Sequence, residues 1–410
     1  MSNPPNPFNP SSSSPAGSAA GSPTASDIAS PAASPAAAST SSPASASANP
    51  SVNLSATTPA NPTAARTVPA AILEDFGRRL LIARGLRAAD AACVAQTLLW
   101  SDLHGIPSHG SALFPVYLKW LAAGDMVASA QPGFISREAT RFTLEGNRCV
   151  GAVAMMSAIE TAVDCAKRNA LCVGSIRNTS HTGAIGRYGA WAAERGCAAL
   201  ILVAGPPLMA YHGARVPSAS TTPVMFALPS AQGDPVIFDM ATSRVSFRRL
   251  QQARASGESL PAGSAIDSEG TVTTDARRAS IPLPIAGAKG AGLSIMIEML
   301  VSLVVGNPLV TDHLRPEGAK RHSQNALMLV MDIAAFRPLD EFRADMGLLA
   351  RTLKSLPLAE GFSEIRLPGE RGARVAEERA RMGIPVPATI RGELSSAAQV
   401  LGVEVPPALS

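Results

Sequence analysis

The sequence predicts an α/β fold, in which a helical unit precedes a longer region of alternating helices and strands. Three observations support this prediction. Apolar residues recur at helical spacing between residues 67 and 124, and short apolar runs separate helical stretches after residue 146. Hydrophobic residues make up 46% of the 410 residues and charged residues 16%. This composition is typical of a compact protein with extensive buried surface.

The first stretch of the chain has almost no apolar residues. Residues 1–66 are rich in Ala, Ser and Pro, and Asp27 is the single charged residue before Arg66. Such a segment cannot offset the entropy that it would lose on ordering. The sequence therefore predicts a disordered tail over residues 1–66.

A helical N-terminal unit is predicted over residues 67–145. One face of its first helix is formed by Ile72, Leu73, Phe76, Leu80 and Leu81. A second helix is predicted over residues 88–100. Ser108 is a candidate N-cap for a third helix that ends at Gly124, in which Pro115 is tolerated only near the start.

An α/β domain is predicted over residues 146–325. Its first elements are a helix at 152–169, a strand at 171–176, a polar turn centred on His181, a helix at 190–196 and a strand at 198–204. Its later elements are strands at 224–228 and 236–238, a helix opening at Asp239, a Gly/Ser/Asp-rich excursion at 256–280 and an apolar helix at 287–305. Residues 326–410 predict a C-terminal α/β unit with a strand near 327–331, a helix near 339–356 and two final helices.

Bulk properties exclude several functional classes. No apolar run reaches the roughly 20 residues of a membrane span, and the net charge of +4 includes no basic block, so neither a membrane nor a nucleic acid is expected as a partner. The five cysteines are scattered and odd in number, which favours reduced thiols and a cytoplasmic location. His104 and His109 are five residues apart, which is not the spacing of two zinc ligands on a helix, and no metal site is predicted.

His181 is the first candidate for catalysis. It lies between a predicted strand and a predicted helix, flanked by Ser180 and Thr182. Histidine has an unperturbed pKa near 6.5, and junctions of this kind face a crevice in α/β sheets, so proton transfer is one interpretation. The alternative is that His181 caps the helix or satisfies a buried hydrogen bond.

Two further stretches have features of an anion or nucleotide site. Gly287–Gly292 is glycine-rich and contains Lys289, but it is not the GxGxxG pattern of a Rossmann fold. Permissive backbone, a helix N-terminus and a lysine together favour a phosphate or ribose contact, whereas the alternative is a tight turn with a solvated lysine. Asp239, at the carboxyl end of a strand, either binds a ribose hydroxyl or caps the next helix.

Taken together, five segments resemble those of one family in their order and spacing. They are residues 102–110, 180–185, 235–243, 287–292 and 367–371. The chain resembles the malate/L-lactate dehydrogenase family, which includes ureidoglycolate, sulfolactate and diketogulonate oxidoreductases and a piperideine/pyrroline-2-carboxylate reductase. The resemblance covers about Val68 to Val405.

The resemblance implies a non-Rossmann dinucleotide-binding fold with a helical N-terminal unit and a C-terminal unit that packs back on the cofactor domain, in a homodimer. It implies hydride transfer between NAD or NADP and a 2-hydroxy or 2-oxo acid or a related compound, with His181 as the acid/base. The other catalytic residues that it implies are Ser108, His109 and Tyr117. The cofactor contacts that it implies are Asp239, Met240, Ala241, Lys289, Gly369, Glu370 and Arg371.

Two alternatives to this activity stay open at the level of sequence. One is a reductase of cyclic imines such as piperideine- or pyrroline-2-carboxylate. The other is a divergent member with weak or lost catalysis that acts as a binding or subunit protein.

Departures from the family pattern concentrate on the substrate side. Leu113 stands where the family has an arginine that pairs with the substrate carboxylate, and Pro206 replaces an asparagine or aspartate. A Gly-Lys pair in the helix after Asp239 reads Arg248–Arg249. One interpretation is a bulkier or less charged substrate beside Leu113; the other is that a different arginine, such as Arg215 or Arg244, binds the carboxylate.

Overall fold

The computed structural model describes residues 65–231, 233–317 and 323–410. The predicted disordered tail therefore lies outside the described residues, apart from Ala65 and Arg66. The α-helices are α1 (Ala70–Ala83), α2 (Ala88–Leu103), α3 (Phe114–Ala123), α4 (Gly151–Asn169), α5 (Gly186–Glu194), α6 (Phe247–Ser256), α7 (Ala288–Glu298), α8 (Leu309–Leu314), α9 (Leu339–Lys354), α10 (Glu370–Met382) and α11 (Ala388–Leu401).

The strands are β1 (Ala65–Val68), β2 (Gly133–Arg137), β3 (Arg141–Glu145), β4 (Leu171–Thr179), β5 (Cys197–Ala204), β6 (Met209–Ala210), β7 (Pro217–Ala219), β8 (Val224–Leu228), β9 (Val236–Met240), β10 (Ala265–Ile266), β11 (Val272–Thr273), β12 (Ile281–Pro282), β13 (Gln324–Asp332) and β14 (Ile384–Pro387). Short 3₁₀ turns η2 (Pro107–His109) and η3 (Ser111–Leu113) precede α3, and a π-helical turn η4 (Met299–Leu303) continues α7.

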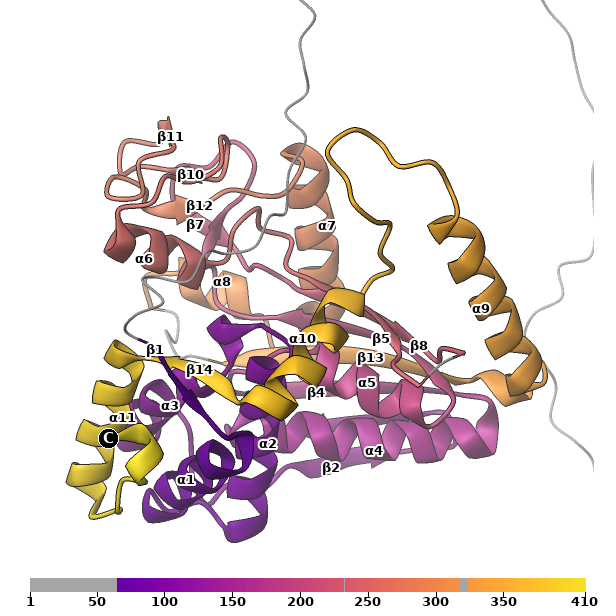
Figure 1. Ribbon diagram of the computed structural model, residues 1–410, viewed down its shortest axis with the longest axis horizontal. Helices are drawn as coiled ribbons and strands as arrows, with labels where there is room; N and C mark the ends of the chain where they lie inside the picture. Colours follow the sequence, from indigo (N-terminus) through magenta and orange to yellow (C-terminus); the bar gives the residue numbers. More distant parts are fainter. Residues whose placement is uncertain (1–64, 232, 318–322) are drawn as a thin grey trace, which may run out of the picture. The chain divides into compact units, whose positions relative to one another are not determined.

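The central element is a mixed seven-stranded sheet in the order β2-β3-β4-β13-β5-β8-β9 (Figure 1). Within it β3 and β4 pair in parallel, and every other neighbouring pair is antiparallel. Because β13 runs opposite to both β4 and β5, and β8 runs opposite to both β5 and β9, the strands β4, β5 and β9 point the same way. Their carboxyl ends therefore meet at one edge of the sheet. His181 follows β4 and Asp239 lies at the end of β9, so the topology brings both to this edge.

Helices cover both faces of this sheet. α4 and α5 pack on one face, and α7 with η4 packs on the other (Figure 1). The core between the sheet and α4 uses small residues on one side of the helix, namely Ala154, Ala158, Ala162 and Ala166. Glycine permits the contact of α5 with β8, because a Cβ at Gly189 would lie 2.4 Å from the Sδ atom of Met225.

A second core joins the first and last helices of the described chain. α1, α2, α3 and α11 share one buried cluster, and β1 pairs with β14. Leu73, Phe76, Leu80 and Leu81 are fully buried, which confirms the predicted apolar face of the first helix, while Ile72 is at its edge and partly exposed. Close packing of α1 on α3 requires Gly77, where a Cβ would lie 2.0 Å from the Phe114 ring.

Several predicted elements differ from the structure. The third helix begins at Phe114 rather than at Ser108, because residues 107–113 form two 3₁₀ turns, although Pro115 does lie near its start and Gly124 ends it at φ +74°. The prediction that a helix opens at Asp239 is wrong: this residue lies within β9, and α6 begins eight residues later, after the N-cap Ser246.

The structure also contains strands where none was predicted. Residues 133–145, within the stretch expected to be helical, supply β2 and β3 of the central sheet. The excursion at 256–280 carries β10 and β11, which form a small sheet with β12. Over the described residues, no helix is long and apolar enough to cross a membrane.

Candidate active site

Four predicted catalytic residues lie together at the carboxyl edge of the sheet. The Tyr117 hydroxyl is 2.7 Å from Nδ1 of His181. The rings of His181 and His109 are stacked, with centroids 5.6 Å apart and planes at 14°. The Ser108 Oγ lies 2.9 Å from Nδ1 of His109. The 3₁₀ turn η2, the start of α3 and the turn after β4 thus contribute to one cluster, which we call the histidine cluster (Ser108, His109, Tyr117 and His181).

The turn that carries His181 is held on both sides of the histidine. The Ser180 hydroxyl accepts the Gly151 N–H at 3.0 Å and donates to the Cys149 carbonyl at 2.8 Å. The Thr182 N–H donates to Gln324 Oε1 at 2.8 Å. Gly151, the first residue of α4, passes so close that a Cβ there would lie 2.3 Å from the His181 carbonyl oxygen. The backbone around His181 is therefore fixed before any ligand binds.

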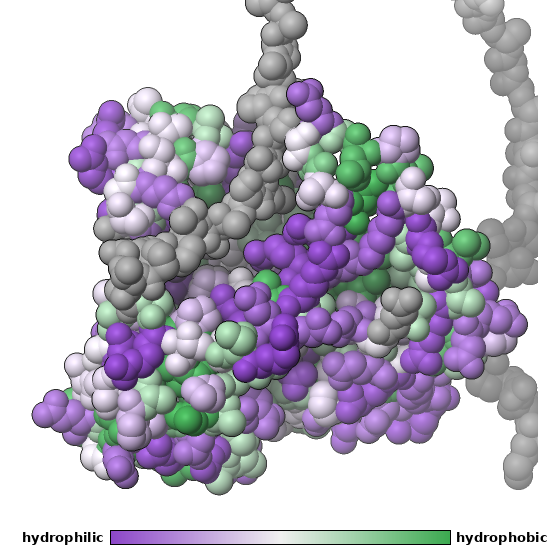
Figure 2. Space-filling view, in the orientation of Figure 1, coloured by the Kyte–Doolittle hydropathy of each residue, from purple (hydrophilic) through white to green (hydrophobic). Residues whose placement is uncertain are grey.

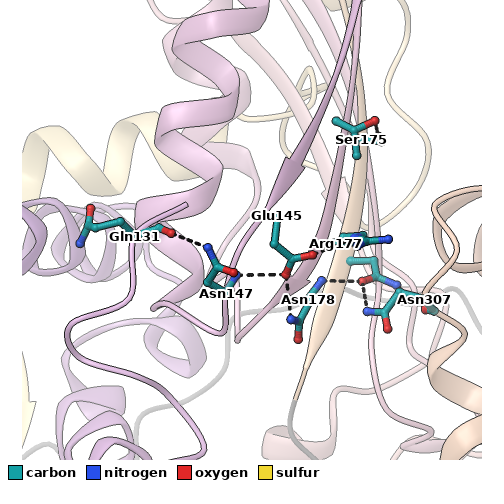
Figure 3. A network of polar contacts seen from close by, with 9 residues as sticks. Gln131, Glu145, Asn147, Ser175, Arg177, Asn178 and Asn307 are labelled. Carbon is teal, nitrogen blue, oxygen red and sulfur yellow. Dashed lines mark hydrogen bonds and ion pairs between the residues drawn. The ribbon is translucent and has the colours of Figure 1, made fainter. Parts of the chain in front are cut away.

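A polar network fixes the end of β4, just before this turn (Figure 3). Asn178, at φ +52°, donates from its side chain to Glu145 Oε1 at 2.7 Å and from its backbone to Asn325 Oδ1 at 3.0 Å. Glu145 also pairs with Arg177 at 2.7 Å. Asn307 donates to the same Asn325 oxygen at 2.8 Å. These contacts tie β4 to β3 and β13 at the point where the chain turns toward His181.

Burial sets the protonation of two members of the histidine cluster, His109 and Tyr117. It lowers the pKa of His109 to about 4, and the positive charge of Arg248 acts in the same direction. Burial raises the pKa of the Tyr117 phenol above its usual value. At neutral pH His109 is therefore uncharged and Tyr117 keeps its proton, so both serve as neutral hydrogen-bonding groups.

Asp102 is a buried carboxyl group beneath the segment that carries Ser108 and His109. It accepts the Ser111 N–H at 2.7 Å, and its backbone carbonyl accepts a hydrogen bond from Arg379 of α10. Burial raises the pKa of Asp102 to about 6, although the bond from Ser111 and the charges of Arg379 and Arg248 oppose this. The ionised form of Asp102, which is present at neutral pH, therefore destabilises the folded state.

We expect Asp102→Asn to stabilise the protein relative to wild type above pH 6 more than at pH 4. Between its ordinary pKa of 3.8 and its folded pKa of about 6, Asp102 keeps its proton only when folded, so wild-type stability falls as pH rises through this window. A shift of about two units corresponds to at most about 3 kcal/mol. Urea unfolding at pH 4 and pH 8 measures the difference. Asp75→Asn is the control, and its effect on stability should depend on pH in the opposite direction. Hydrogen bonding from Arg78 lowers the pKa of Asp75, so its ionised form stabilises the folded protein.

Asp239 links the end of β9 to the start of α5, just after the His181 turn. Its Oδ2 accepts the N–H of Gly186, the first residue of α5, at 2.8 Å. Asp239 is accessible to solvent, yet protein atoms crowd its carboxylate, and this loss of hydration raises its pKa to about 6. In the described part of the chain, Oδ1 has no hydrogen-bond partner, so it is able to accept from a ligand hydroxyl.

The other predicted cofactor residues gather along β9 and the start of α7. Met240 and Ala241 follow Asp239, and the Thr242 carbonyl accepts the Ile285 N–H at 2.8 Å, which brings the turn before Lys289 to this strand. Buried hydroxyls connect the same segments: Thr222 contacts Thr242 at 2.9 Å and Ser294 of α7 at 3.0 Å. Lys289 itself is exposed.

The segment 367–371 also reaches β9. The Pro368 carbonyl accepts the Ile237 N–H at 3.2 Å, and Gly369, at φ +94°, would place a Cβ 3.0 Å from the Ile237 nitrogen. Glu370 accepts the Leu367 N–H at 3.1 Å and pairs with Lys354, so its carboxylate holds the turn. Arg371 is exposed. A cavity of about 350 Å³ lies between α9, α10 and the turn before β9, and Gly369 and Glu370 line it.

These residues fit a dinucleotide on structural grounds. A Cβ at Gly186 would lie 3.1 Å from the Trp100 ring and 3.2 Å from Asp239 Oδ2, so glycine keeps the helix start beside Asp239 narrow. That start, a carboxylate with a free oxygen and the lysine near the N-terminus of α7 supply groups that bind hydroxyls and phosphates. Among the described residues, no group of three His, Cys, Asp or Glu residues could hold a metal ion.

One residue that sequence reasoning did not place in the site is Arg248. Its Nη2 lies 3.4 Å from the carbonyl oxygen of Ala112, next to Leu113. Arg215 and Arg244, the two arginines suggested from the sequence, are exposed and lie beside Gly270 and Gly263 instead. The only sequence signal was the change of the family's Gly-Lys pair to Arg248–Arg249.

Comparisons with known proteins agree on one group. Residues 68–395 match the sequence model of the family described as malate/L-lactate dehydrogenase. The chain is 29% identical to a malate dehydrogenase of Pyrococcus abyssi over 82% of this chain and 95% of that protein. It is 29% identical to a Delta(1)-pyrroline-2-carboxylate/Delta(1)-piperideine-2-carboxylate reductase of Pseudomonas putida over 84% and 99% of the two chains. The solved malate dehydrogenase of Pyrococcus horikoshii superimposes with a TM-score of 0.76 at 28% identity, covering 83% and 97%.

Proposed function

The chain belongs to the malate/L-lactate dehydrogenase family and is an oxidoreductase that uses a nicotinamide cofactor, and we propose that His181 is its acid/base on a 2-hydroxy or 2-oxo acid or a related imine. The observation that carries this proposal is the contact of 2.7 Å between the Tyr117 hydroxyl and Nδ1 of His181. This contact engages Nδ1, and we assign the exchange of a proton with the substrate to Nε2, the other ring nitrogen.

The bound nicotinamide, as NAD or NADP, supplies or accepts the hydride. The protein supplies the proton. In reduction the imidazolium form of His181 acts: Nδ1–H donates to the Tyr117 oxygen, and Nε2–H gives its proton to the oxygen or nitrogen on which charge develops, which leaves a neutral imidazole. In oxidation the neutral imidazole keeps its proton on Nδ1, hydrogen-bonded to Tyr117, and Nε2 takes the proton from the substrate. Neutral His109, oriented by Ser108, lies parallel to His181 and supplies a second hydrogen-bonding group.

For the cofactor side we propose contacts from Asp239, Met240, Ala241, Lys289, Gly369 and Arg371. Asp239 has one free oxygen, Lys289 lies near a helix N-terminus, and Gly369 approaches β9 closely. For Glu370 we propose an indirect role, because its carboxylate is engaged by Leu367 and Lys354.

We expect NADH or NADPH to raise the melting temperature. A ligand at 100 times its Kd stabilises a protein by about 2.7 kcal/mol. Lys289→Ala should reduce the shift, since it removes a charge-assisted contact with a phosphate. Thermal unfolding with each cofactor at millimolar concentration measures the shift in melting temperature. Lys119→Ala, which changes a lysine on α3, is the control. Equal shifts in Lys289→Ala and wild type would remove Lys289 from the cofactor site.

A substrate panel tests the proposed activity. It contains 2-oxo acids, cyclic imino acids and neutral ketones, each read by oxidation of NADH or NADPH. Turnover of a 2-oxo acid supports the main proposal. Preference for a cyclic imine supports the reductase alternative, which the Pseudomonas putida relative favours. No turnover of any compound, with cofactor binding intact, would support the alternative of a member that has lost catalysis.

We further propose a cytoplasmic homodimer. An apolar stripe runs along the exposed side of α7 and η4, formed by Leu293, Met296, Leu300, Leu303 and Val304, which are 42–73% exposed. Figure 2 shows a second apolar patch over the loop between α9 and α10, where Leu356, Leu358 and Phe362 are exposed. A second copy of this chain is the partner that we propose for the α7–η4 stripe. Sedimentation in solution measures the mass.

A further inference from the structure

Arg248 extends from the first turn of α6 to the segment before α3. The Ser246 hydroxyl accepts the Arg249 N–H at 3.0 Å and so fixes where α6 begins. From there the Arg248 Nη2 donates to the carbonyl oxygen of Ala112 at 3.4 Å. A cation thus reaches the turn η3, between His109 and Leu113, from a part of the chain 136 residues away.

The Arg248 guanidinium has unused hydrogen-bonding capacity. Its Nε is buried and has no partner among the described residues. Arg248 forms no ion pair with any described carboxylate, although the charges of Glu393 and Asp102 act on it. A buried N–H without a partner costs about 1–3 kcal/mol. Nη1 also has no partner among the described residues and, unlike Nε, is not enclosed, so a carboxylate is able to approach the guanidinium fork and accept two hydrogen bonds from it.

Arg248 also acts on the histidine cluster. Its charge contributes to the low pKa of His109, next in importance to burial. Asp102, another neighbouring carboxyl, already accepts the Ser111 N–H, and burial raises its pKa. The region between η3 and the histidine cluster therefore holds a fixed positive charge that no described carboxylate pairs with directly.

We propose that Arg248 binds the carboxylate of the substrate and so makes this enzyme selective for 2-oxo or 2-imino acids over neutral ketones. This inference rests on the proposed function. Leu113 then lines the pocket with its apolar side chain, while the cation comes from α6. Arg215 and Arg244 are exposed beside Gly270 and Gly263, and Arg249 is paired with Glu258, so of these four arginines Arg248 is the one that contacts the segment before α3 and has no ion-pair partner among the described residues.

The test compares Arg248→Met with Arg249→Met, a change of the same kind at the next residue of the same helix. Pyruvate and phenylpyruvate serve as acids, and their amides serve as neutral counterparts. We expect Arg248→Met to lower kcat/KM for the acids by about 10- to 100-fold, to leave kcat/KM for the amides unchanged within about twofold, and to leave NADH affinity at its wild-type value without lowering the melting temperature. Arg248→Lys should recover part of the loss, because it restores the charge without the planar fork.

Equal losses for acids and amides, or equal losses in the two methionine variants, would overturn the role of Arg248. A binding measurement keeps this test independent of turnover. Oxalate, titrated calorimetrically into the NADH-saturated protein, should bind wild type and Arg249→Met and fail to bind Arg248→Met. If wild type turns over no compound but shows this pattern, the proposed activity fails while Arg248 remains the anion site; if oxalate binds all three proteins equally, the inference on Arg248 fails.

Discussion

His181→Ala should lower kcat by about 10²- to 10⁴-fold while the affinity for NADH changes little. The imidazole is the group of the histidine cluster to which we assign the proton transfer, and alanine has no proton to transfer. The backbone turn should persist, because Ser180 and Thr182 hold it through their own hydrogen bonds. Steady-state kinetics with the best substrate of the panel, together with titration of NADH, measure both quantities.

Two variants serve as comparisons for His181→Ala. His313→Ala changes a histidine of α8 that bonds to the carbonyl of Leu309 in its own helix, and it should leave kcat unchanged. Tyr117→Phe removes the hydroxyl that contacts Nδ1 of His181. It should lower kcat by up to about tenfold, which corresponds to the loss of one hydrogen bond. A His181→Ala enzyme with near-normal kcat would return His181 to a structural role.

Gly151→Ala should lower both activity and stability although we assign residue 151 no contact with the substrate. Its Cβ would lie 2.3 Å from the His181 carbonyl oxygen and 2.6 Å from that of Ser180, so the turn must move. Overpacking of this kind costs about 1–3 kcal/mol. A displacement of about 1 Å of a catalytic group costs on the order of 10²-fold in rate. Urea unfolding and kcat on the same preparation measure the two effects.

Gly392→Ala is the matched control for this substitution. Gly392 lies inside α11 and is exposed, and a Cβ added there would have open space around it, with no neighbouring atom within 4 Å. Alanine there should stabilise the helix by up to about 1 kcal/mol and leave kcat unchanged. An unaltered kcat in Gly151→Ala would show that the exact position of the His181 turn does not limit the rate.

Local patterns predicted the local parts of this molecule. The apolar face of α1, the helix end at Gly124 and the junction at His181 each depend on a few neighbouring residues, and the structure contains all three. Asp239 was misplaced because an aspartate before a polar stretch is equally typical of a strand end and of an N-cap. Residues 133–145 were assigned to the helical unit, since the place of the β2–β3 pair in the central sheet depends on the pairing of β3 with β4, which lies about 30 residues further along the chain.

The candidate site also contains residues that the sequence identified and one that it did not. Ser108, His109 and Tyr117 were assigned from the resemblance to one family, and the structure brings them to His181. The position of Arg248 could not be derived from spacing, because its contact with Ala112 depends on where α6 lies against η3. A departure from the family pattern, such as leucine in place of arginine at residue 113, can therefore be interpreted only when the residues around it in the folded chain are known.

The pairing of β1 with β14 has a consequence for the order of folding. Val68 lies opposite Ile384, and Leu394 and Ala398 of α11 complete the core around α1. During synthesis the N-terminal helices therefore leave the ribosome long before the residues that cover them. Contacts so distant in sequence are costly to close and form late. The central sheet is able to assemble first, whereas the segment that carries Ser108 and His109 gains its final support from α10 and α11 only when nearly the whole chain has been made.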